Sequence, residues 1–249
     1  MSILVYGFVS VVAAALVLAP LPLIPMQSSR GFTLIELLTV IGIIAILAGL
    51  SFFGLGRARS AAYRASCAAN FREMGVSILS YTHDHKGYLP GPLYVGQFAS
   101  YSGDTSDGRI GTFLAPYLNL PDLHDPAKSV NQNRQPQMAE ALSCPAWMGA
   151  MRDTGIDLAT ARPYILAGAV RMDNDLTAAP FGQAGTTKLP QLISLIRNPT
   201  TSAAFWELDH ENGGSTYSSN TGVVPEPVHG DVRMAVYFDG HVGAVPIDS

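Results

Sequence analysis

One carboxylate lies within a long apolar stretch near the start of the chain. Glu36 follows the segment Gly-Phe-Thr-Leu-Ile at 31–35, and the next charged side chain is Arg57. A carboxylate at the centre of a bilayer costs about 2.5–3.5 kcal/mol, so such groups face a polar partner rather than lipid. The position of Glu36 therefore predicts that this side chain meets a cation.

The apolar stretch around Glu36 is long enough to cross a membrane. It covers 32–53, about 22 residues, which at a rise of about 1.5 Å per residue span about 33 Å. The hydrocarbon core of a bilayer is about 30 Å thick. A buried helix of a soluble core is the alternative, but such helices seldom lack charges over so many residues. We expect a transmembrane helix at 32–53.

The segment Gly-Phe-Thr-Leu-Ile-Glu at 31–36 resembles the cleavage and methylation motif of type IV prepilins and of the pseudopilins of type II secretion. The resemblance implies that a prepilin peptidase cuts after Gly31 and methylates the new amine of Phe32. This positive amine would pair with Glu36 of a neighbouring subunit and set the axial register of a filament. The helices would pack side by side through small residues, which are Gly42, Ala45 and Gly49.

The same resemblance implies partners and a location. The partners are the prepilin peptidase, other pilin-like subunits and an assembly platform in the inner membrane. The chain would cross the bacterial inner membrane once, with its head in the periplasm and the assembled fibre in the periplasm or at the cell surface. Arg30 precedes the span, whereas Arg57, Arg59 and Arg64 follow it, so a count of positive charges alone favours the opposite orientation. We give the motif precedence over this count.

Residues 1–31 would form the leader, and 1–25 differ from the short basic leaders of the family. This part is apolar, carries no charge and is interrupted by Pro20, Pro22 and Pro25. Residues 26–31 alone would make a normal short leader. We therefore expect translation to start at Met26. If 1–25 are present in the protein, they add a second membrane-inserted arm.

The helix is expected to continue beyond the membrane over 54–86. Apolar residues recur there at steps of three and four, which lines one face of a helix. They are Tyr63, Cys67, Phe71, Met74, Ile78 and Tyr81. Lys86, Gly87 and Pro90 form a typical stop signal. The apolar face should carry the head at 87–249.

The head is rich in Gly, Pro, Asn and Asp, with short β-like runs between turns. The strand candidates are 164–170, 202–208, 234–238 and 241–245, and an Asp-Gly turn joins the last two. Long connections at 99–111 and 121–138 are expected to be irregular and on the surface. We predict a pilin-like α+β fold, in which a long N-terminal helix, membrane-spanning in its first half, packs on a C-terminal antiparallel β-sheet.

Two cysteines, Cys67 and Cys144, are candidates for a disulfide because the head should enter an oxidising compartment. Cys67 lies on the apolar face of the helix, and Cys144 follows a leucine in a segment that looks buried. A bond between them would join the helix to the rest of the head. Two small buried thiols are the alternative, and the spacing does not exclude it.

The end of the chain contains a His-x9-Asp-Gly pattern, formed by His229, Asp239 and Gly240, that resembles a C-terminal motif of many pilin-like proteins. We favour a structural role, in which a hydrogen bond from His229 and Asp239 fixes the last hairpin. The carboxylates of Asp209, Glu211, Asp231 and Asp239 are candidate ligands for calcium, and zinc is a further option. Solvated turn residues are the simpler interpretation, and no cofactor is required.

The charge distribution argues against binding to nucleic acid. Up to Gly75 the chain carries five Arg and two Glu, a balance of +3, and the rest carries ten Lys or Arg against seventeen Asp or Glu, a balance of −7. An acidic head lacks the basic patch that phosphates require.

No nucleophile elbow, His-Glu-x-x-His helix or phosphate loop is found, so we do not expect an enzyme. A tethered hydrolase would have to depend on His229 or Asp239. We expect a structural subunit of a type II secretion pseudopilus or a type IV pilus-like fibre. The alternative is a monomeric, membrane-anchored periplasmic binding protein.

Overall fold

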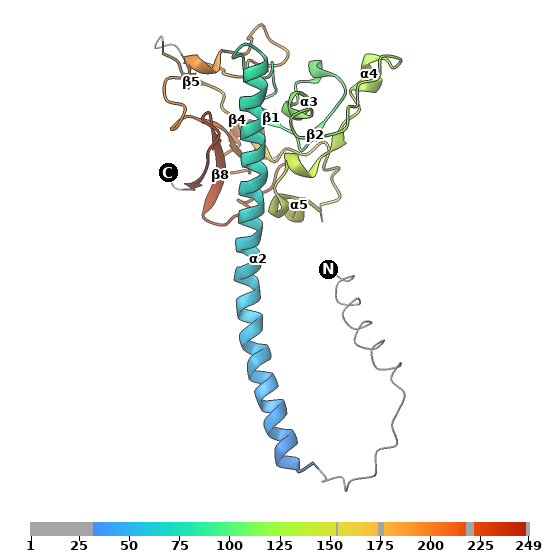
Figure 1. Ribbon diagram of the computed structural model, residues 1–249, viewed down its shortest axis with the longest axis vertical. Coiled ribbons are helices and arrows are strands. Elements are labelled where there is room, and N and C mark those ends of the chain that lie inside the picture. The colour runs from blue at the N-terminus through green and yellow to red at the C-terminus, as the bar shows by residue number, and fades with distance from the viewer. Residues whose placement is uncertain (1–31, 153, 174–176, 218–221, 248–249) are drawn as a thin grey trace. The chain divides into compact units, whose positions relative to one another are not determined.

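The computed structural model describes residues 32–152, 154–173, 177–217 and 222–247, apart from the side chains of 50–55 (Figure 1). The chain divides into two units, Met1–Phe52 and Phe53–Ser249. Helix α2, Leu34–Asp84, begins in the first unit and ends in the second. No proline occurs over these residues, so no backbone donor of the helix is missing.

The first unit contributes the N-terminal part of α2. Within the described residues, no helix is both long and apolar enough to cross a membrane. The span expected at 32–53 is not found there and stays a prediction from the sequence. The leader expected at 1–31, including the start at Met26, lies outside the described residues.

In the second unit, the apolar face predicted for the helix is the face that packs on the sheet. Cys67, Phe71, Met74 and Ile78 are buried, and Tyr63 and Tyr81 are half-buried. The helix ends in a Schellman motif: Lys86 has a positive φ of 55°, and the Gly87 amide donates to the Thr82 carbonyl at 2.7 Å. The helix itself ends at Asp84, just before the stop signal that the sequence contains.

The main sheet of the head has five strands in the order β1-β4-β7-β8-β9, all antiparallel. These strands are β1 (Gly96–Gln97), β4 (Tyr164–Leu166), β7 (Ala203–Glu207), β8 (Val232–Tyr237) and β9 (Val242–Pro246). Four of them match the predicted runs. The α+β class with an antiparallel sheet is confirmed, whereas β1 was not predicted because two residues carry no periodic signal.

The core lies between the second unit's part of α2 and this sheet (Figure 1). The ring centroid of Phe205 on β7 lies 5.3 Å from those of Phe71 on α2 and Tyr164 on β4. Burial raises the pKa of Tyr164, and its hydroxyl donates to the Phe98 carbonyl at 3.0 Å. Three aromatic rings from three elements therefore fix the helix against the sheet.

Two glycines let the last hairpin approach the helix closely. Gly240 has a φ of 85° in the turn between β8 and β9, and a Cβ there would lie 2.9 Å from Cδ1 of Leu79. A Cβ on Gly75 of α2 would lie 3.0 Å from Cγ1 of Val236. The Asp-Gly turn thus combines a left-handed backbone with contact to the helix, and glycine meets both requirements.

The remaining elements are short. They are β2 (Ser100–Tyr101), η1 (Thr105–Asp107), α3 (Ile110–Leu114), α4 (Val130–Asn133), β3 (Gln137–Met138), η2 (Glu140–Leu142), α5 (Pro145–Arg152), β5 (Val170–Arg171), β6 (Thr177–Ala178), η3 (Ile193–Leu195) and α6 (Gly214–Tyr217). β2 pairs with β3, and β5 pairs with β6. The expectation of surface irregularity at 99–111 is wrong in part, because Ala99 and Ser100 are fully buried and Ser100 belongs to β2.

Candidate functional site

The motif at the start of α2 forms a capping box. The Glu36 Oε2 atom accepts hydrogen bonds from the Thr33 backbone amide at 2.9 Å and from the Thr33 hydroxyl at 2.8 Å. The Glu36 amide donates to the Thr33 hydroxyl at 3.3 Å. These reciprocal bonds satisfy amides that the first turn of a helix leaves without partners. The Thr-x-x-Glu spacing could have predicted this box, which our reading of the sequence missed.

The large apolar side chains of this first part of α2 are exposed. Leu34 is 83% exposed, and Phe32, two residues before it, is 78% exposed. The other members of the set are Ile35, Leu37, Leu38, Val40, Ile41, Ile43, Ile44, Ile46 and Leu47. A Cβ added at Gly42 or Gly49 would meet nothing within 4 Å. The described residues thus provide no contact that would require glycine at these positions. Gly31 lies outside the described residues.

In the head, a disulfide joins Cys67 of α2 to Cys144, the residue before α5, with a Cα–Cα distance of 4.6 Å. The bond links residues 77 positions apart in the sequence. Closing a loop of this size contributes about 4–5 kcal/mol in the chain-entropy model. Its apolar neighbours include Trp147 and Met151, so the bond lies in a second small core beside the main one.

His229 and Glu207 lie against this disulfide and are also buried. The His229 Nε2 atom lies 3.1 Å from Glu207 Oε1 and 3.4 Å from the Cys144 sulfur. Glu207 Oε2 accepts a hydrogen bond of 2.8 Å from the Met234 amide. Sequence reasoning did not single out Glu207, because a glutamate at the end of a strand carries no local sign that its partner lies on a distant turn.

The two ends of the C-terminal motif, His229 and Asp239, have different contacts. Asp239 accepts bonds from the amide and ring nitrogen of His241, at 3.1 and 2.6 Å. Partial burial acts to raise the pKa of Asp239, but these hydrogen bonds outweigh it and lower the pKa. The structural hydrogen bonding expected at the last hairpin is therefore present for Asp239, which fixes the turn locally. For His229 the expectation is wrong, because this side chain contacts Glu207 and the disulfide instead.

The four carboxylates considered as calcium ligands contact arginine or histidine side chains at three different places. Arg233 binds buried Asp209 with two hydrogen bonds, of 2.6 and 3.0 Å, and half-exposed Glu211 with one of 2.9 Å. Asp231 faces Arg64 at 3.3 Å. Asp239 contacts His241, as described above. The partners of the four carboxylates are thus Arg233, Arg64 and His241. The structure does not bring the four carboxylates to one point.

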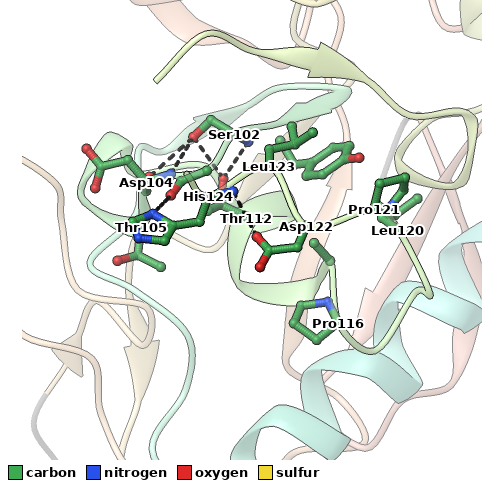
Figure 2. A pocket seen from close by; sticks show the side chains of 13 residues that line it. Ser102, Asp104, Thr105, Thr112, Pro116, Leu120, Pro121, Asp122, Leu123 and His124 are labelled. Atoms are coloured by element: carbon green, nitrogen blue, oxygen red, sulfur yellow. Dashed lines mark hydrogen bonds between the residues drawn. The ribbon is translucent and has the colours of Figure 1, made fainter. Parts of the chain in front are cut away.

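A cavity of about 480 Å³ opens between the segments around β2, α3 and 120–124. Figure 2 shows Ser102, Thr112 and His124 at one end of it, away from Pro116, Leu120 and Pro121. The Ser102 amide donates to the Thr112 hydroxyl at 3.0 Å, and the His124 ring contacts the Gly103 carbonyl at 2.9 Å. These groups hold the loops of the wall together.

Asp104, at the edge of this cavity, also forms hydrogen bonds that hold the wall together. Burial acts to raise the pKa of Asp104, but hydrogen bonds from Ser106 and Arg134 outweigh it and lower the pKa. The carboxylate therefore stays ionised and paired with Arg134 at 2.8 Å. Such a group fits a structural role better than proton transfer.

The comparisons with known proteins bear on the start of the chain. The family model described as the prokaryotic N-terminal methylation motif matches residues 26–52. No curated protein and no solved structure matches the chain. The match does not reach the motif at 229–240. It supports a prepilin-like protein, a pilin-type precursor that is processed by prepilin peptidase.

Proposed function

We propose that this protein is a pilin-like structural subunit, which assembles through its N-terminal helix into a type II secretion pseudopilus or a type IV pilus-like fibre. The observation that carries the proposal is the start of α2, where a methylation motif precedes a helix whose apolar side chains are exposed. Exposed apolar surface of this extent marks a surface that other molecules cover.

The chemistry of assembly begins with peptide cleavage. Hydrolysis after Gly31 converts the amide of Phe32 into an amine, which carries a positive charge even after methylation. Glu36 presents Oε2 to Thr33, while Oε1 has no hydrogen bond among the described residues. This free oxygen is the acceptor for the amine of a neighbouring subunit. Thr33 holds the carboxylate in place and leaves one side of it open.

Lateral packing supplies the remaining contact between subunits. In lipid, helices associate through close packing of small residues, because apolar surfaces gain little by leaving the hydrocarbon. Gly42 and Gly49 have open space above their Cα atoms, which a neighbouring helix can fill. We place 32–53 in the bacterial inner membrane before assembly, with the head in the periplasm. The prepilin peptidase and an assembly platform of that membrane are the partners.

A second candidate is a membrane-anchored binding protein that remains monomeric. The observation in its favour is the cavity of about 480 Å³, a size that suits small-molecule ligands. Its polar groups bond mainly to one another and to the wall. The two candidates differ in what they demand of Glu36, since an anchored monomer gains nothing from a carboxylate in lipid.

The substitution Glu36→Ala tests the proposal. The variant should be made and cleaved, but it should be lost from the sheared filament fraction, because the neighbour's amine finds no carboxylate. Glu73→Ala is the matched control, an exposed glutamate on the same helix within the head unit. Assembly of Glu36→Ala at the level of the Glu73→Ala control would refute the fibre proposal and favour the anchored monomer.

A further inference from the structure

Four buried side chains of the head bring potential ligand atoms to one point. They belong to Cys67, Cys144, Glu207 and His229, and the atoms all lie within 4.8 Å of one another. Cys67 comes from α2, Cys144 directly precedes α5, Glu207 ends β7 and His229 lies in the turn before β8. This set differs from the carboxylates that the sequence indicated, and only the fold brings it together.

The donor set fits zinc. Two sulfurs, an imidazole nitrogen and a carboxylate oxygen are ligands that zinc accepts, and structural sites are tetrahedral. With Zn–S bonds of about 2.3 Å and Zn–N bonds of about 2.0–2.1 Å, the ligand atoms of a tetrahedron lie about 3.3–3.8 Å apart. His229 Nε2 already lies 3.1 Å from Glu207 Oε1 and 3.4 Å from the Cys144 sulfur.

One carboxylate oxygen in this cluster lacks a hydrogen bond. Glu207 is more than nine-tenths buried, and its Oε1 atom accepts no hydrogen bond among the described residues, although Nε2 of His229 lies nearby. Its other oxygen is held by the Met234 amide. Buried polar atoms are normally satisfied, so an oxygen that points at a cluster of ligands indicates a place for a cation.

We propose that the reduced head binds one Zn²⁺ ion through the thiolates of Cys67 and Cys144, Nε2 of His229 and Oε1 of Glu207. A dithiol reductant supplies two electrons and two protons to the disulfide and leaves as its own cyclic disulfide. Zn²⁺ then replaces the two thiol protons, which pass to solvent. Freed from their bond, the two sulfurs move apart to the spacing of a tetrahedral site.

The ion would occupy the place where the disulfide joins α2 to the rest of the head. The same junction thus has two alternative links, a covalent one in the oxidised chain and a metal one in the reduced chain. Two thiolates and one carboxylate give the zinc site one net negative charge. Arg64 donates to the backbone carbonyl of His229 and so places a positive charge next to this zinc-binding residue. This role is independent of filament assembly.

Zinc content of the full chain in detergent tests the proposal. The disulfide is reduced with a phosphine, which takes oxygen from water, and the protein is then equilibrated with Zn²⁺ and desalted. Mass spectrometry of the metal should find about one zinc per reduced chain and a background level in the oxidised chain. The Cys67→Ser, Cys144→Ser double variant should stay at background. Equal zinc in the reduced wild type and this variant would overturn the proposal.

Single variants identify the other two ligands. Glu207→Gln and His229→Ala should each weaken zinc binding at least tenfold, whereas His241→Ala, an exposed histidine on the same hairpin, should leave it unchanged. Where a variant fails to fold, the ligands are identified instead from the absorption spectrum of Co²⁺ bound to the reduced wild-type protein. Tetrahedral cobalt bands with thiolate charge transfer are expected. An octahedral spectrum without sulfur bands would overturn the proposal.

Discussion

The two units of the chain differ in whether their large side chains are exposed or buried. In the first unit the large apolar side chains are exposed, and the glycines Gly42 and Gly49 face open space. In the head, aromatic rings, a disulfide and several charged groups are buried against partners from distant parts of the sequence. Among the described residues, the head buries these groups within its own chain, whereas the large apolar side chains of the first unit stay exposed.

The acidic groups show the same contrast. Asp209 is buried and receives two hydrogen bonds from Arg233 of the same chain. Glu36 receives bonds only from Thr33 among the described residues and meets no cation there. A buried carboxylate is stable only when it is paired, and the head supplies the cation for Asp209 from its own chain. Glu36 is exposed in the structure, and under the proposed assembly its cation comes from a neighbouring subunit.

The largest contrast in stability should come from deleting apolar side chains. Phe205→Ala should lower the free energy of unfolding of the head by about 3–5 kcal/mol, because the ring packs against Phe71 and Tyr164. Ile44→Ala in the first unit should change it by less than about 0.5 kcal/mol. Denaturant unfolding in detergent measures both. Equal losses would show that the first unit also packs on the chain itself.

Ion pairs should show a similar difference. Arg233→Met should destabilise the head by about 3–5 kcal/mol, since it leaves the buried carboxylate of Asp209 unpaired. Lys128→Met removes the exposed pair with Asp125 and should have a much smaller effect, because solvent screens such a pair. The measurement is again the free energy of unfolding. A small effect at Arg233 would mean that solvent reaches Asp209.

Glycine substitutions should separate backbone roles in the two units. Gly240→Ala should cost about 1–3 kcal/mol, because the residue has a positive φ and its Cβ would approach Leu79. Gly42→Ala should leave the head unchanged and favour the helix by about 0.5–1 kcal/mol. Thermal unfolding reports the first effect. A bulky side chain in Gly42→Leu should instead block assembly, as the amount of sheared fibre would show.

The smallest effect should be a pH dependence at the last turn. The lowered pKa of Asp239 means that its contribution is present above the unfolded pKa of about 3.9 and is lost as pH falls through the lower folded pKa. Asp239→Asn should therefore remove less than about 1 kcal/mol at pH 7 and flatten the loss of stability below about pH 4. Unfolding titrations at several pH values test this. If Asp239→Asn lost stability at acid pH as steeply as the wild type does, the role of the His241 contact would be contradicted.

Local sequence patterns predicted the long elements and the local turns. The steps of three and four that bury Phe71, Met74 and Ile78 can be read directly, as can the hairpin at Asp239-Gly240. Pairings between distant segments could not be predicted in this way. Glu207 meets His229 because the fold brings the end of a strand to a distant turn, and single-sequence periodicity does not encode that arrangement. The disulfide between Cys67 and Cys144, 77 positions apart, was a candidate from the sequence, and the structure contains it.

The state of the peptide bond between Gly31 and Phe32 tests the central claim most directly. N-terminal mass spectrometry of the protein from peptidase-containing cells should find N-methylated Phe32 as the first residue, and the same analysis of cells without the peptidase should find the precursor. An intact bond after Gly31 in the peptidase-containing cells would contradict the account, because no amine would then be available for Glu36 of a neighbour.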